Sequence, residues 1–304
     1  MTTIIESKAG RYQWHENWAT IPASENGRTH GLGVTRDGRV FVFHQAVPGV
    51  LVFTHEGQLV DSWGNYPGAH GLTVVEEGDE EFLWLVDQDR AVAEKTTLKG
   101  DVVQSLPKPP HTVYATANYV PTWAVVNELR FGGNGDIWLA DGYGASLVHR
   151  YDASGNYLST IDGTEGAGRF ACPHGIWFDS RKRPAELYIA DRGNKRVQVY
   201  DAEGKFLRSF GTDFLTSPDG FAPVGDHLIV PELCARVSIL DAADKLVDIL
   251  GENDAICAAP GWPNETPLSE GKFNSPHGAV ANSRGDIFVV EWRVGGRIIK
   301  LEKL

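Results

Sequence analysis

The chain has 304 residues, 42% of them hydrophobic and 22% charged, which is the balance of a globular protein with a sizeable core. Its formal net charge of −12 opposes binding to a nucleic-acid backbone, and no stretch approaches the roughly 18 consecutive apolar residues of a membrane helix. Its first residues lack the basic and apolar segments of a secretory signal. We therefore expect a cytoplasmic protein with neither nucleic acid nor membrane as its partner.

Taken in chain order, short apolar runs bounded by turn residues recur along the sequence. They are HGLGVT (30–35), HGLTVV (70–75), WAVV (123–126), PHGIWF (173–178), DGFAPV (219–224) and HGAVAN (277–282). The runs begin near 30, 70, 123, 174, 219 and 277, at spacings of roughly 40–60 residues, close to the length of a propeller blade. This regularity predicts an all-β, six-bladed β-propeller of the NHL type forming a single domain over residues 1–304.

The fourth copy shows the repeat most fully. After PHGIWF come ELYIADRGNKRVQVY (186–200) and DAEGKFLRSFG (201–211), which read as three further strands separated by turns. Four short strands per blade are therefore predicted.

The two ends of the chain complement each other. The last copy stops at RIIKLEKL (297–304), one strand short, whereas RYQWHENWATI (11–21) precedes the first copy and has no blade of its own. We expect segment 11–21 to supply the missing strand and remove an open sheet edge. Trp14 and Trp18 are then packing residues. The longest irregular regions, about 105–122 and 252–275, are expected as surface loops over the binding face.

Residues at the start of each blade's first strand converge on the axis of a propeller, however far apart they lie in sequence. The six equivalent positions hold His30, His70, Trp123, His174, Asp219 and His277. Neutral imidazoles suit Zn²⁺, and three protein ligands with an open position are typical of catalytic zinc. We expect at least three of these histidines to bind a metal; the alternative is a hydrated channel in which each ring bonds a nearby carbonyl or water.

A second ring of residues follows from the ends of the second strands. These positions hold His44, Asp87, Asp141, Asp191, Glu232 and Glu291, and the acidic ones are expected to cap turns or pair with a repeat arginine such as Arg196. The residues just after them, which we expect at the rim of the same face, are Gln45, Arg90, Tyr143, Arg192 and Arg293. A phenol and several guanidiniums there can move a proton and hold an anionic substrate.

The three cysteines suggest no special chemistry. Cys172, Cys234 and Cys257 are odd in number, far apart in sequence and form no Cys-X-X-Cys pair. Reduced, buried thiols are therefore expected, with Cys172 a minor candidate as a fourth metal ligand.

These motifs resemble NHL-repeat propellers and, among them, the peptidyl-α-hydroxyglycine α-amidating lyases, blade by blade across essentially the whole chain. The zinc ligands of that family lie in HGL- and PH-type turns of blades two, four and six, so the resemblance implies His70, His174 and His277 as metal ligands. The DGYG turn (141–144) and IADRGNKRV (189–197) match its catalytic tyrosine and its arginine. The resemblance therefore implies Tyr143 and Arg192 as the catalytic pair, with Arg192 binding substrate.

The sequence also departs from the family. FVFHQA (41–46) places Gln45 where the family has an arginine, and Gly278 replaces an aspartate of its central calcium site. His30 and Asp219 are additional polar residues at axial positions and hence additional metal candidates. The fold and the metal chemistry are thus expected to carry over better than the substrate.

The leading hypothesis is a zinc-dependent lyase that cleaves a carbinolamide-like small substrate bearing a carboxylate. In it, Tyr143 relays a proton and Arg192 clamps the carboxylate, while His44, Gln45, Asp87 and Arg293 complete the pocket. A second hypothesis is a lactonase- or esterase-like hydrolase that uses Ca²⁺, which Asp219 keeps open. A third is a non-enzymatic NHL platform for protein interaction.

Overall fold

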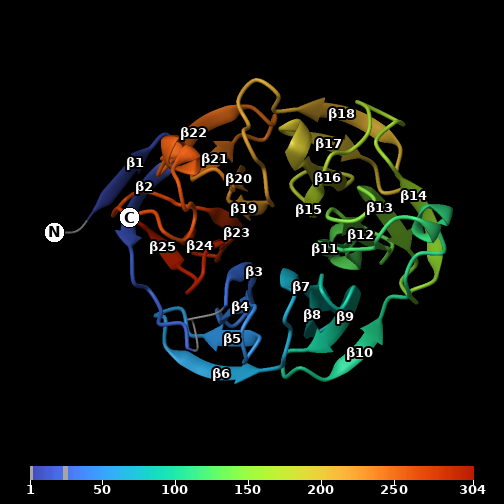
Figure 1. Ribbon diagram of the computed structural model, residues 1–304, viewed down its shortest axis with the longest axis horizontal. Coiled ribbons are helices and arrows are strands. Elements are labelled where there is room, and N and C mark those ends of the chain that lie inside the picture. The colour runs from blue at the N-terminus through green and yellow to red at the C-terminus, as the bar shows by residue number, and fades with distance from the viewer. Residues whose placement is uncertain (1–2, 23–26) are drawn as a thin grey trace. The chain divides into compact units, whose positions relative to one another are not determined.

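In the computed structural model, which describes residues 3–22 and 27–304, the strands form six antiparallel sheets (Figure 1). The predicted all-β, six-bladed propeller is confirmed, with the sheets as its blades. Contacts between residues divide the chain into two compact units, Pro67–Asp213 and Met1–Tyr66 with Phe214–Leu304. The assignment of residues 1–304 to a single domain stays a prediction.

The unit Pro67–Asp213 contains blades two, three and four. Blade two is formed by β7 (Ala69–Glu77), β8 (Glu80–Asp87), β9 (Val92–Thr97) and β10 (Val102–Ser105). Blade three is formed by β11 (Trp123–Val126), β12 (Ile137–Asp141), β13 (Leu147–Tyr151) and β14 (Tyr157–Ile161). Blade four is formed by β15 (Pro173–Asp179), β16 (Glu186–Asp191), β17 (Arg196–Tyr200) and β18 (Phe206–Phe210).

The other unit contains blades one, five and six. Blade one is formed by β3 (Thr29–Val34), β4 (Val40–His44), β5 (Val50–Phe53) and β6 (Leu59–Trp63). Blade five is formed by β19 (Ala222–Val224), β20 (His227–Glu232), β21 (Arg236–Leu240) and β22 (Leu246–Leu250). Blade six is formed by β23 (Pro276–Ala281), β24 (Ile287–Glu291), β25 (Ile298–Lys303), β2 (Gly10–His15) and β1 (Ile4–Ser7).

The helices of the described residues are short 3-10 turns. They are η2 (Thr112–Ala115), η3 (Leu129–Phe131), η4 (Arg192–Asn194) and η5 (Asp254–Ala258). Within the described part of the chain, no helix has the length and apolar character needed to cross a membrane.

The predicted starts of the blades agree with the first strands to within one residue, except in blade five. There, Pro218 pairs with Glu232 as an isolated bridge and the amide of Asp219 donates to the Pro231 carbonyl at 2.9 Å. Pairing then lapses, and β19 begins only at Ala222. The strand predicted from Asp219 is therefore three residues shorter at its start than the sequence pattern indicates.

The hydrophobic cores lie between neighbouring blades, which explains why the middle strands are apolar on both faces. In β12, Ile137 and Leu139 pack in the core shared with blade two, whereas Trp138 and Ala140 pack in the core shared with blade four. Successive residues of a strand point to opposite faces of its sheet. Each middle strand thus fills two cores, and all five residues of β12 are buried.

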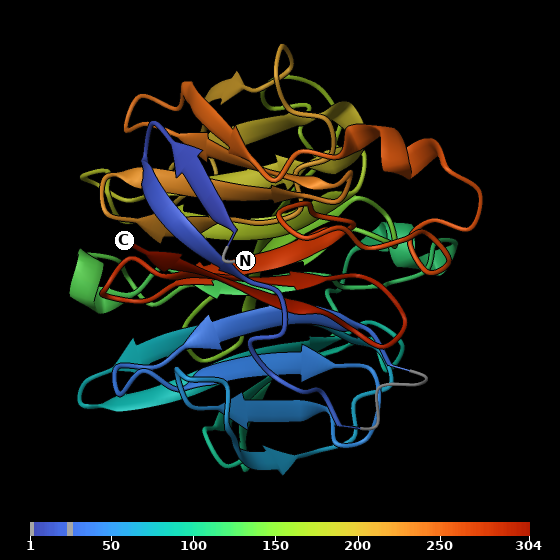
Figure 2. The ribbon, with the colours of Figure 1, turned by 90° about the vertical axis from the view of Figure 1, so that its left-hand side faces the viewer.

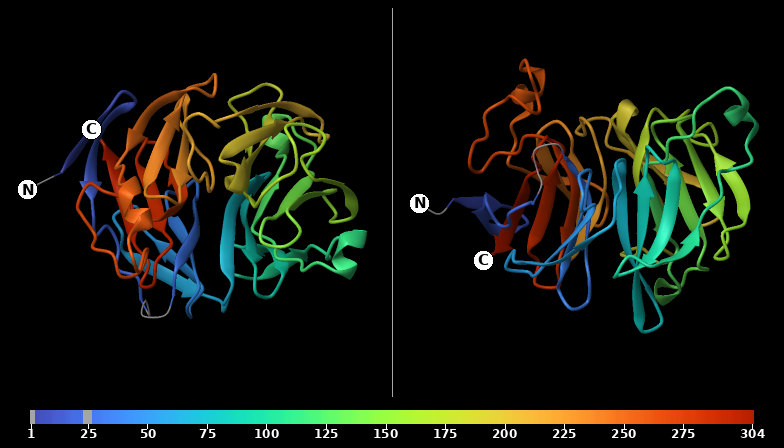
Figure 3. Two further views of the ribbon diagram at one scale, coloured as in Figure 1. Left: turned by 45° about the horizontal axis from the view of Figure 1, so that its top comes forward. Right: turned by 60° about the horizontal axis from the view of Figure 1, so that its bottom comes forward.

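The prediction that the N-terminal segment completes the last blade is confirmed. β2 pairs antiparallel with β25, joining Trp14 to Leu301, and β1 adds a further outer strand (Figure 2). In the views of Figure 3, this blue hairpin lies along the edge of the red blade six. Trp14 packs 4.9 Å from Phe273 and Trp18 packs 4.8 Å from Phe288. Both tryptophans are buried packing residues, as predicted.

Candidate metal and catalytic site

The axial histidines lie where the first strands depart from regular pairing. The register shifts between Ala69 and Leu72 in β7, between Pro173 and Ile176 in β15, and between Pro276 and Gly278 in β23. A shift also falls between Thr29 and Leu32 in β3. An irregularity of this kind changes the direction of a side chain relative to the sheet. The register shift at each His-Gly segment therefore sets the direction in which its histidine points.

The glycine after the histidine is needed for a close approach between neighbouring strands. A Cβ at Gly71 would lie 2.5 Å from the carbonyl oxygen of Thr122, and a Cβ at Gly278 would lie 2.5 Å from that of His30. No side chain fits at such distances. The His-Gly pair therefore indicates a close backbone contact with the neighbouring strand as well as a candidate functional side chain.

In the unit Pro67–Asp213, His70, His174 and Tyr143 form one group. The phenol oxygen of Tyr143 lies 3.1 Å from Nε2 of His70 and 2.9 Å from Nε2 of His174, and the two imidazole rings are 4.7 Å apart. Both histidines are fully buried, whereas 39% of Tyr143 is exposed. A partly exposed tyrosine thus brings its hydroxyl to two buried imidazoles.

The protonation of His70 follows from its surroundings. Its Nδ1 lies 2.8 Å from the Thr122 carbonyl, which can only accept, so Nδ1 carries the hydrogen and Nε2 presents a lone pair. Burial lowers the pKa of His70 to about 3. The hydrogen bond to Thr122 acts in the opposite direction and raises the pKa, and the nearby charge of Arg192 lowers it further. The imidazole is therefore neutral near neutral pH, as a metal ligand must be.

Arg192 joins the same group from the end of β16. Its Nη2 donates to the Tyr143 hydroxyl and to Sγ of Cys172, each at 3.3 Å, and its guanidinium lies 5.4 Å from the Tyr143 ring. The expected association of Tyr143 with Arg192 is present in the structure. Cys172 contacts the arginine, in a half-buried position with a left-handed backbone (φ 59°).

A buried network holds the turn that carries Tyr143. Asp141 accepts from the amides of Val120 and Ala145, each at 2.7 Å, and from the Tyr114 hydroxyl at 2.7 Å. The Tyr114 oxygen also lies 2.7 Å from Nε2 of His149. The loop before β11 is thereby fastened to the DGYG turn, and the position of region 105–122 over a binding face stays a prediction.

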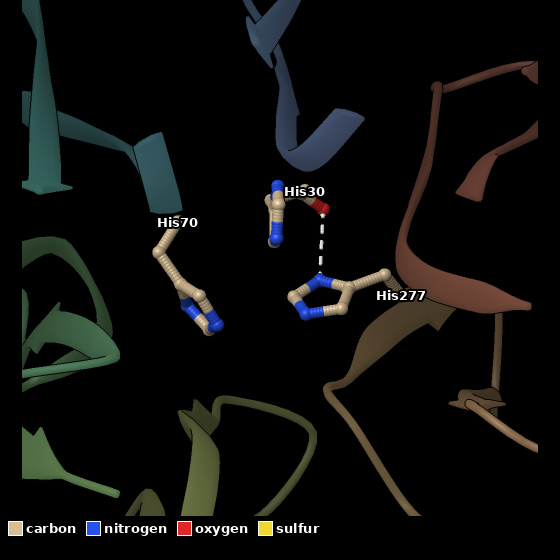
Figure 4. Close-up of side chains that lie close together, drawn as sticks. All are labelled: His30, His70 and His277. Atoms are coloured by element: carbon tan, nitrogen blue, oxygen red, sulfur yellow. Dashed lines mark hydrogen bonds between the residues drawn. The ribbon is translucent and has the colours of Figure 1, made fainter. Parts of the chain in front are cut away.

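In the other unit, His30 and His277 lie against each other. Nδ1 of His277 is 3.3 Å from the His30 carbonyl oxygen, which fixes the hydrogen on Nδ1 (Figure 4). Their rings are 4.5 Å apart in an edge arrangement, and a nitrogen of each lies within 4.8 Å of the other. Both side chains are 2% exposed. Two imidazoles are thus available at one point of this unit.

Asp219 belongs to the same neighbourhood despite the shortened strand that follows it. It is fully buried, and one of its carboxylate oxygens lies within 4.8 Å of a His277 nitrogen. The additional candidates His30 and Asp219 are therefore both beside His277.

The remaining predicted pocket residues have varied surroundings. Gln45 and Arg293 are half-buried; the amide of Gln45 bonds to the Arg28 carbonyl at 3.0 Å, and Nη2 of Arg293 donates to the Asn264 carbonyl at 3.2 Å. His44 is fully buried, and burial lowers its pKa. Asp87 is 1% exposed and accepts from the amides of Asp89 and Arg90. A role in substrate binding stays a prediction for all four.

The prediction that the acidic residues cap turns is confirmed for Asp87 and Asp141, which accept amides of the turn that follows their strand. The acids of blades three to six make further contacts. Each accepts backbone amides from the segment before its blade, and three pair with an arginine at or near the start of the third strand. The pairs are Asp191–Arg196 at 2.7 Å, Glu232–Arg236 at 3.0 Å and Glu291–Arg297 at 2.8 Å. These carboxylates are structural anchors of the face that bears the histidines.

The donor chemistry of each unit fits a borderline metal ion. His70 and His277 both place Nδ1 on a main-chain carbonyl, which fixes the ring so that Nε2 is free of a hydrogen and oriented for a bond to a metal. Ca²⁺ takes oxygen ligands, and Asp219 is the carboxylate placed beside His277. A histidine-rich cluster of this composition can bind a metal, and imidazole favours zinc over calcium.

Sequence reasoning missed the supporting residues. Tyr114 lies outside any motif and reaches Asp141 through the folding of its loop, whereas His149 lies in β13 and contacts Tyr114. The pairing of Cys234 with Cys257, described below, was likewise hidden by their distance in sequence. The sequence feature that could have indicated Tyr114 is that it is a polar residue in the loop predicted over the binding face.

No family model matches the chain. It is 29% identical over 248 residues to NHL repeat-containing protein 3 of Homo sapiens, covering 76% of this chain and 70% of that protein. It is 26% identical over 211 residues to a probable peptidyl-α-hydroxyglycine α-amidating lyase of Caenorhabditis elegans. That match covers 60% of this chain and 57% of the worm protein. The homologues of the chain are NHL repeat-containing proteins and an amidating lyase. The stated resemblance is thereby confirmed at the level of ancestry.

Solved structures agree on the fold. A streptogramin B lyase superimposes with a TM-score of 0.65 at 14% identity, covering 99% of this chain and all of that one. A gluconolactonase from Xanthomonas campestris superimposes with a TM-score of 0.66 at 13% identity, covering 100% of this chain and 95% of that one. At such identities the likeness establishes the propeller fold alone.

Proposed function

We propose that the chain is a zinc-dependent lyase of the peptidyl-α-hydroxyglycine α-amidating type, with His70, His174 and His277 as the zinc ligands. The observation that carries this proposal is the position of the Tyr143 hydroxyl, within hydrogen-bonding distance of both His70 and His174 and of the Arg192 guanidinium. The set of three ligands rests on their places in blades two, four and six and on the homology to an amidating lyase.

The reaction converts a carbinolamide into an amide and a carbonyl compound. The substrate hydroxyl loses a proton as the carbonyl forms, the carbon–nitrogen bond breaks, and the departing nitrogen gains a proton. Bound zinc would polarise that hydroxyl and lower its pKa by several units. Tyr143 is the proton carrier of the proposal, because its hydroxyl lies at the Nε2 side of two imidazoles and its residue is partly exposed.

Arg192 holds the substrate in this proposal. A guanidinium binds a carboxylate through two parallel hydrogen bonds, which fixes both its position and its orientation. Its contact with the Tyr143 hydroxyl would place a carboxylate bound by Arg192 close to the proton carrier. The substrate is accordingly a small hydroxylated compound with a carboxylate next to the reacting carbon.

Replacing His174 with alanine tests the zinc site. We expect purified wild-type protein to carry about one zinc ion per chain and the variant to carry almost none, because three-ligand zinc sites rarely survive the loss of a ligand. Metal content is measured by mass spectrometry after exhaustive buffer exchange. The control is His55→Ala, at a half-buried surface position paired with Glu56. Unchanged zinc in a folded His174→Ala protein would eliminate this ligand set.

Replacing Tyr143 with phenylalanine tests the proton carrier. Since the ring is retained and only the hydroxyl is lost, we expect kcat to fall by about 100- to 10,000-fold with zinc content unchanged. Turnover is followed as amide release from a peptidyl-α-hydroxyglycine. The matched control is Tyr188→Phe, whose hydroxyl accepts a hydrogen bond from Arg208 at 2.9 Å. Near-normal turnover of Tyr143→Phe would rule out the assigned role.

A calcium-dependent hydrolase of the lactonase type is the second candidate, and the observation that favours it is Asp219 beside His277. In that case His30 and Asp219 would contribute to the metal site. Chelation followed by addition of zinc or calcium separates the two: restoration of lyase turnover by zinc supports the first candidate, and restoration of lactone hydrolysis by calcium supports the second.

A further inference from the structure

Two of the cysteines, remote in sequence, meet in the unit that contains blades five and six. Cys234 follows β20 in the turn to β21, and Cys257 lies in η5, within the long segment that leads from blade five to blade six. Their thiols are close enough to interact with each other. Both are half-buried rather than buried, which corrects the expectation of buried thiols.

The backbone around the two thiols is clamped at several points. The amide of Asn253 donates to the Ala235 carbonyl at 2.9 Å, and Arg236 reaches both Glu252 and Asp254 at 3.3 Å. The start of segment 252–275 is therefore tied to the turn that carries Cys234. The meeting of the thiols is a consequence of this docking.

The surroundings make Cys234 the more reactive thiol. Interactions with Cys257 and with the Ser217 hydroxyl lower the pKa of Cys234 to about 7 against the opposing effects of burial and of two carboxylates. Cys257 donates its proton to Cys234, and this raises the pKa of Cys257. A low-pKa, accessible thiol beside a second thiol is the arrangement of redox-sensitive cysteines.

We propose that Cys234 and Cys257 form a reversible redox dithiol, whose disulfide fixes segment 252–275 to the turn between β20 and β21. The attacking thiol is Cys234 and the resolving thiol is Cys257. The oxidant is a low-molecular-weight disulfide.

The exchange balances in two steps. The Cys234 thiolate attacks one sulfur of the external disulfide, forming a mixed disulfide and releasing one external thiolate, which takes up the proton lost by Cys234. Once Cys234 carries no negative charge, the cause of the raised pKa of Cys257 is gone. Cys257 then loses its proton and attacks the Cys234 sulfur, releasing the second external thiol. Two protein thiols are oxidised and one external disulfide is reduced to two thiols.

The segment fixed by the disulfide reaches residues of the candidate site. Asn264 accepts from Arg293 through its carbonyl and from the Val294 amide through its side chain, and Trp262 lies 6.3 Å from Trp292. The same segment runs directly into Pro276 and His277. In Figure 3 it is the orange-red stretch, extending beyond the strands of its own unit. Oxidation would therefore restrain the loop that bounds this side of the site.

The proposal is tested by incubating the full-length protein with oxidised glutathione, blocking free thiols with iodoacetamide, and digesting without reductant. Mass spectrometry should find the Cys234 peptide linked to the Cys257 peptide, with two hydrogens fewer than the reduced pair, and Cys172 alkylated. Hydrogen exchange of segment 252–275 should slow on oxidation and recover with reductant. A glutathione adduct that persists on Cys234 of the wild type without an internal disulfide would overturn the proposal.

Variants at Cys257 separate its two roles. Cys257→Ser keeps a hydrogen-bond donor but cannot form the disulfide with Cys234. This variant should therefore accumulate the glutathione adduct at Cys234. Cys257→Ala also loses the donor, so its rate of adduct formation near neutral pH should fall about tenfold relative to Cys257→Ser, with its pH midpoint raised toward that of an ordinary thiol. Equal rates and midpoints in the two variants would contradict the assigned donor role. These readouts require neither zinc nor lyase turnover.

Discussion

Main-chain carbonyls, rather than carboxylates, orient the candidate ligands. The Thr122 carbonyl, just before β11, holds His70 of β7, and the His30 carbonyl of β3 holds His277 of β23. In each case the neighbouring blade supplies the acceptor. A histidine is thereby oriented by backbone that no side-chain substitution removes, which makes its tautomer a property of the packing between blades.

His149 gives a pH-dependent contribution to stability that does not involve the candidate ligands. It is fully buried between Tyr114 and Thr160, and burial lowers its pKa to about 3. The unfolded chain protonates this ring below about pH 6.5, whereas the folded chain does not until about pH 3. Its contribution is therefore complete above pH 6.5 and is lost on acidification between these values, at about 1.4 kcal/mol for each pH unit.

The measurement is the free energy of unfolding from denaturant titrations between about pH 7 and about pH 5. On acidification, the free energy of unfolding of His149→Gln should decrease less steeply than that of the wild type, by the contribution of one titrating histidine. Parallel curves for wild type and His149→Gln would show that the ring is protonated in the folded protein.

Sequence patterns located the residues whose position is set by the repeat. The His-Gly pairs mark both an imidazole and a close strand contact, and DGYG marks a turn whose Asp141 must be anchored. Tyr114 could not be found in this way, because its contact depends on how a loop folds over the next blade. The same holds for Cys234 and Cys257, which meet through the docking of segment 252–275.

At the scale of the strand, the same kind of ion pair recurs in blades four, five and six. An acid ending the second strand pairs with an arginine at or near the start of the third, and the acid also accepts amides from the segment before its blade. In blade six, Glu291 accepts from the Asn274 amide and pairs with Arg297, which also bonds Glu16 beyond β2. One arginine thus joins the middle strand, the closing strand and the segment leading to His277.

Arg297→Met should therefore destabilise the protein strongly. The arginine side chain is 5% exposed and that of Glu291 is fully buried, so the substitution leaves a buried carboxylate without its cation, at a cost of about 3–5 kcal/mol. Arg11→Met is the control in the same blade, because both side chains of the Arg11–Glu6 pair are largely exposed. That change should cost at most about 1 kcal/mol. Similar losses for the two variants, measured by urea titration, would contradict this account.

The sequence pattern was least reliable where a strand is interrupted. Blade five was expected to begin at Asp219, yet regular pairing starts at Ala222 after an isolated bridge at Pro218. Short apolar runs predict that a strand exists better than where it starts, since one backbone bond can form without its neighbour. Asp219 is nevertheless beside His277, because that single bridge is enough to place it.

At the scale of the whole chain, the two ends meet in one sheet. β2 covers the edge of β25, and Trp14 adds its contact with Phe273. The rest of the repeat is local, with each blade made from consecutive strands. The prediction from residues 11–21 succeeded because the last repeat lacks one strand and the chain carries an additional segment before the first repeat. Pairing that segment with the last blade completes the blade. The outermost strand, β1, was not anticipated, since nothing in the repeat calls for it.

Removing residues 1–16 should accordingly have a larger effect than removing residues 1–8. The longer deletion uncovers β25, abolishes the Trp14 contact and takes Glu16 from Arg297, so we expect a loss of at least about 3–5 kcal/mol in the free energy of unfolding. It also leaves an open strand edge that can pair with another molecule, so sedimentation should detect larger species as concentration rises. The shorter deletion removes only β1, whose partner is β2, and keeps β25 covered. Deletions with equal stability and equal sedimentation would mean that the blade does not depend on β2 for its closure.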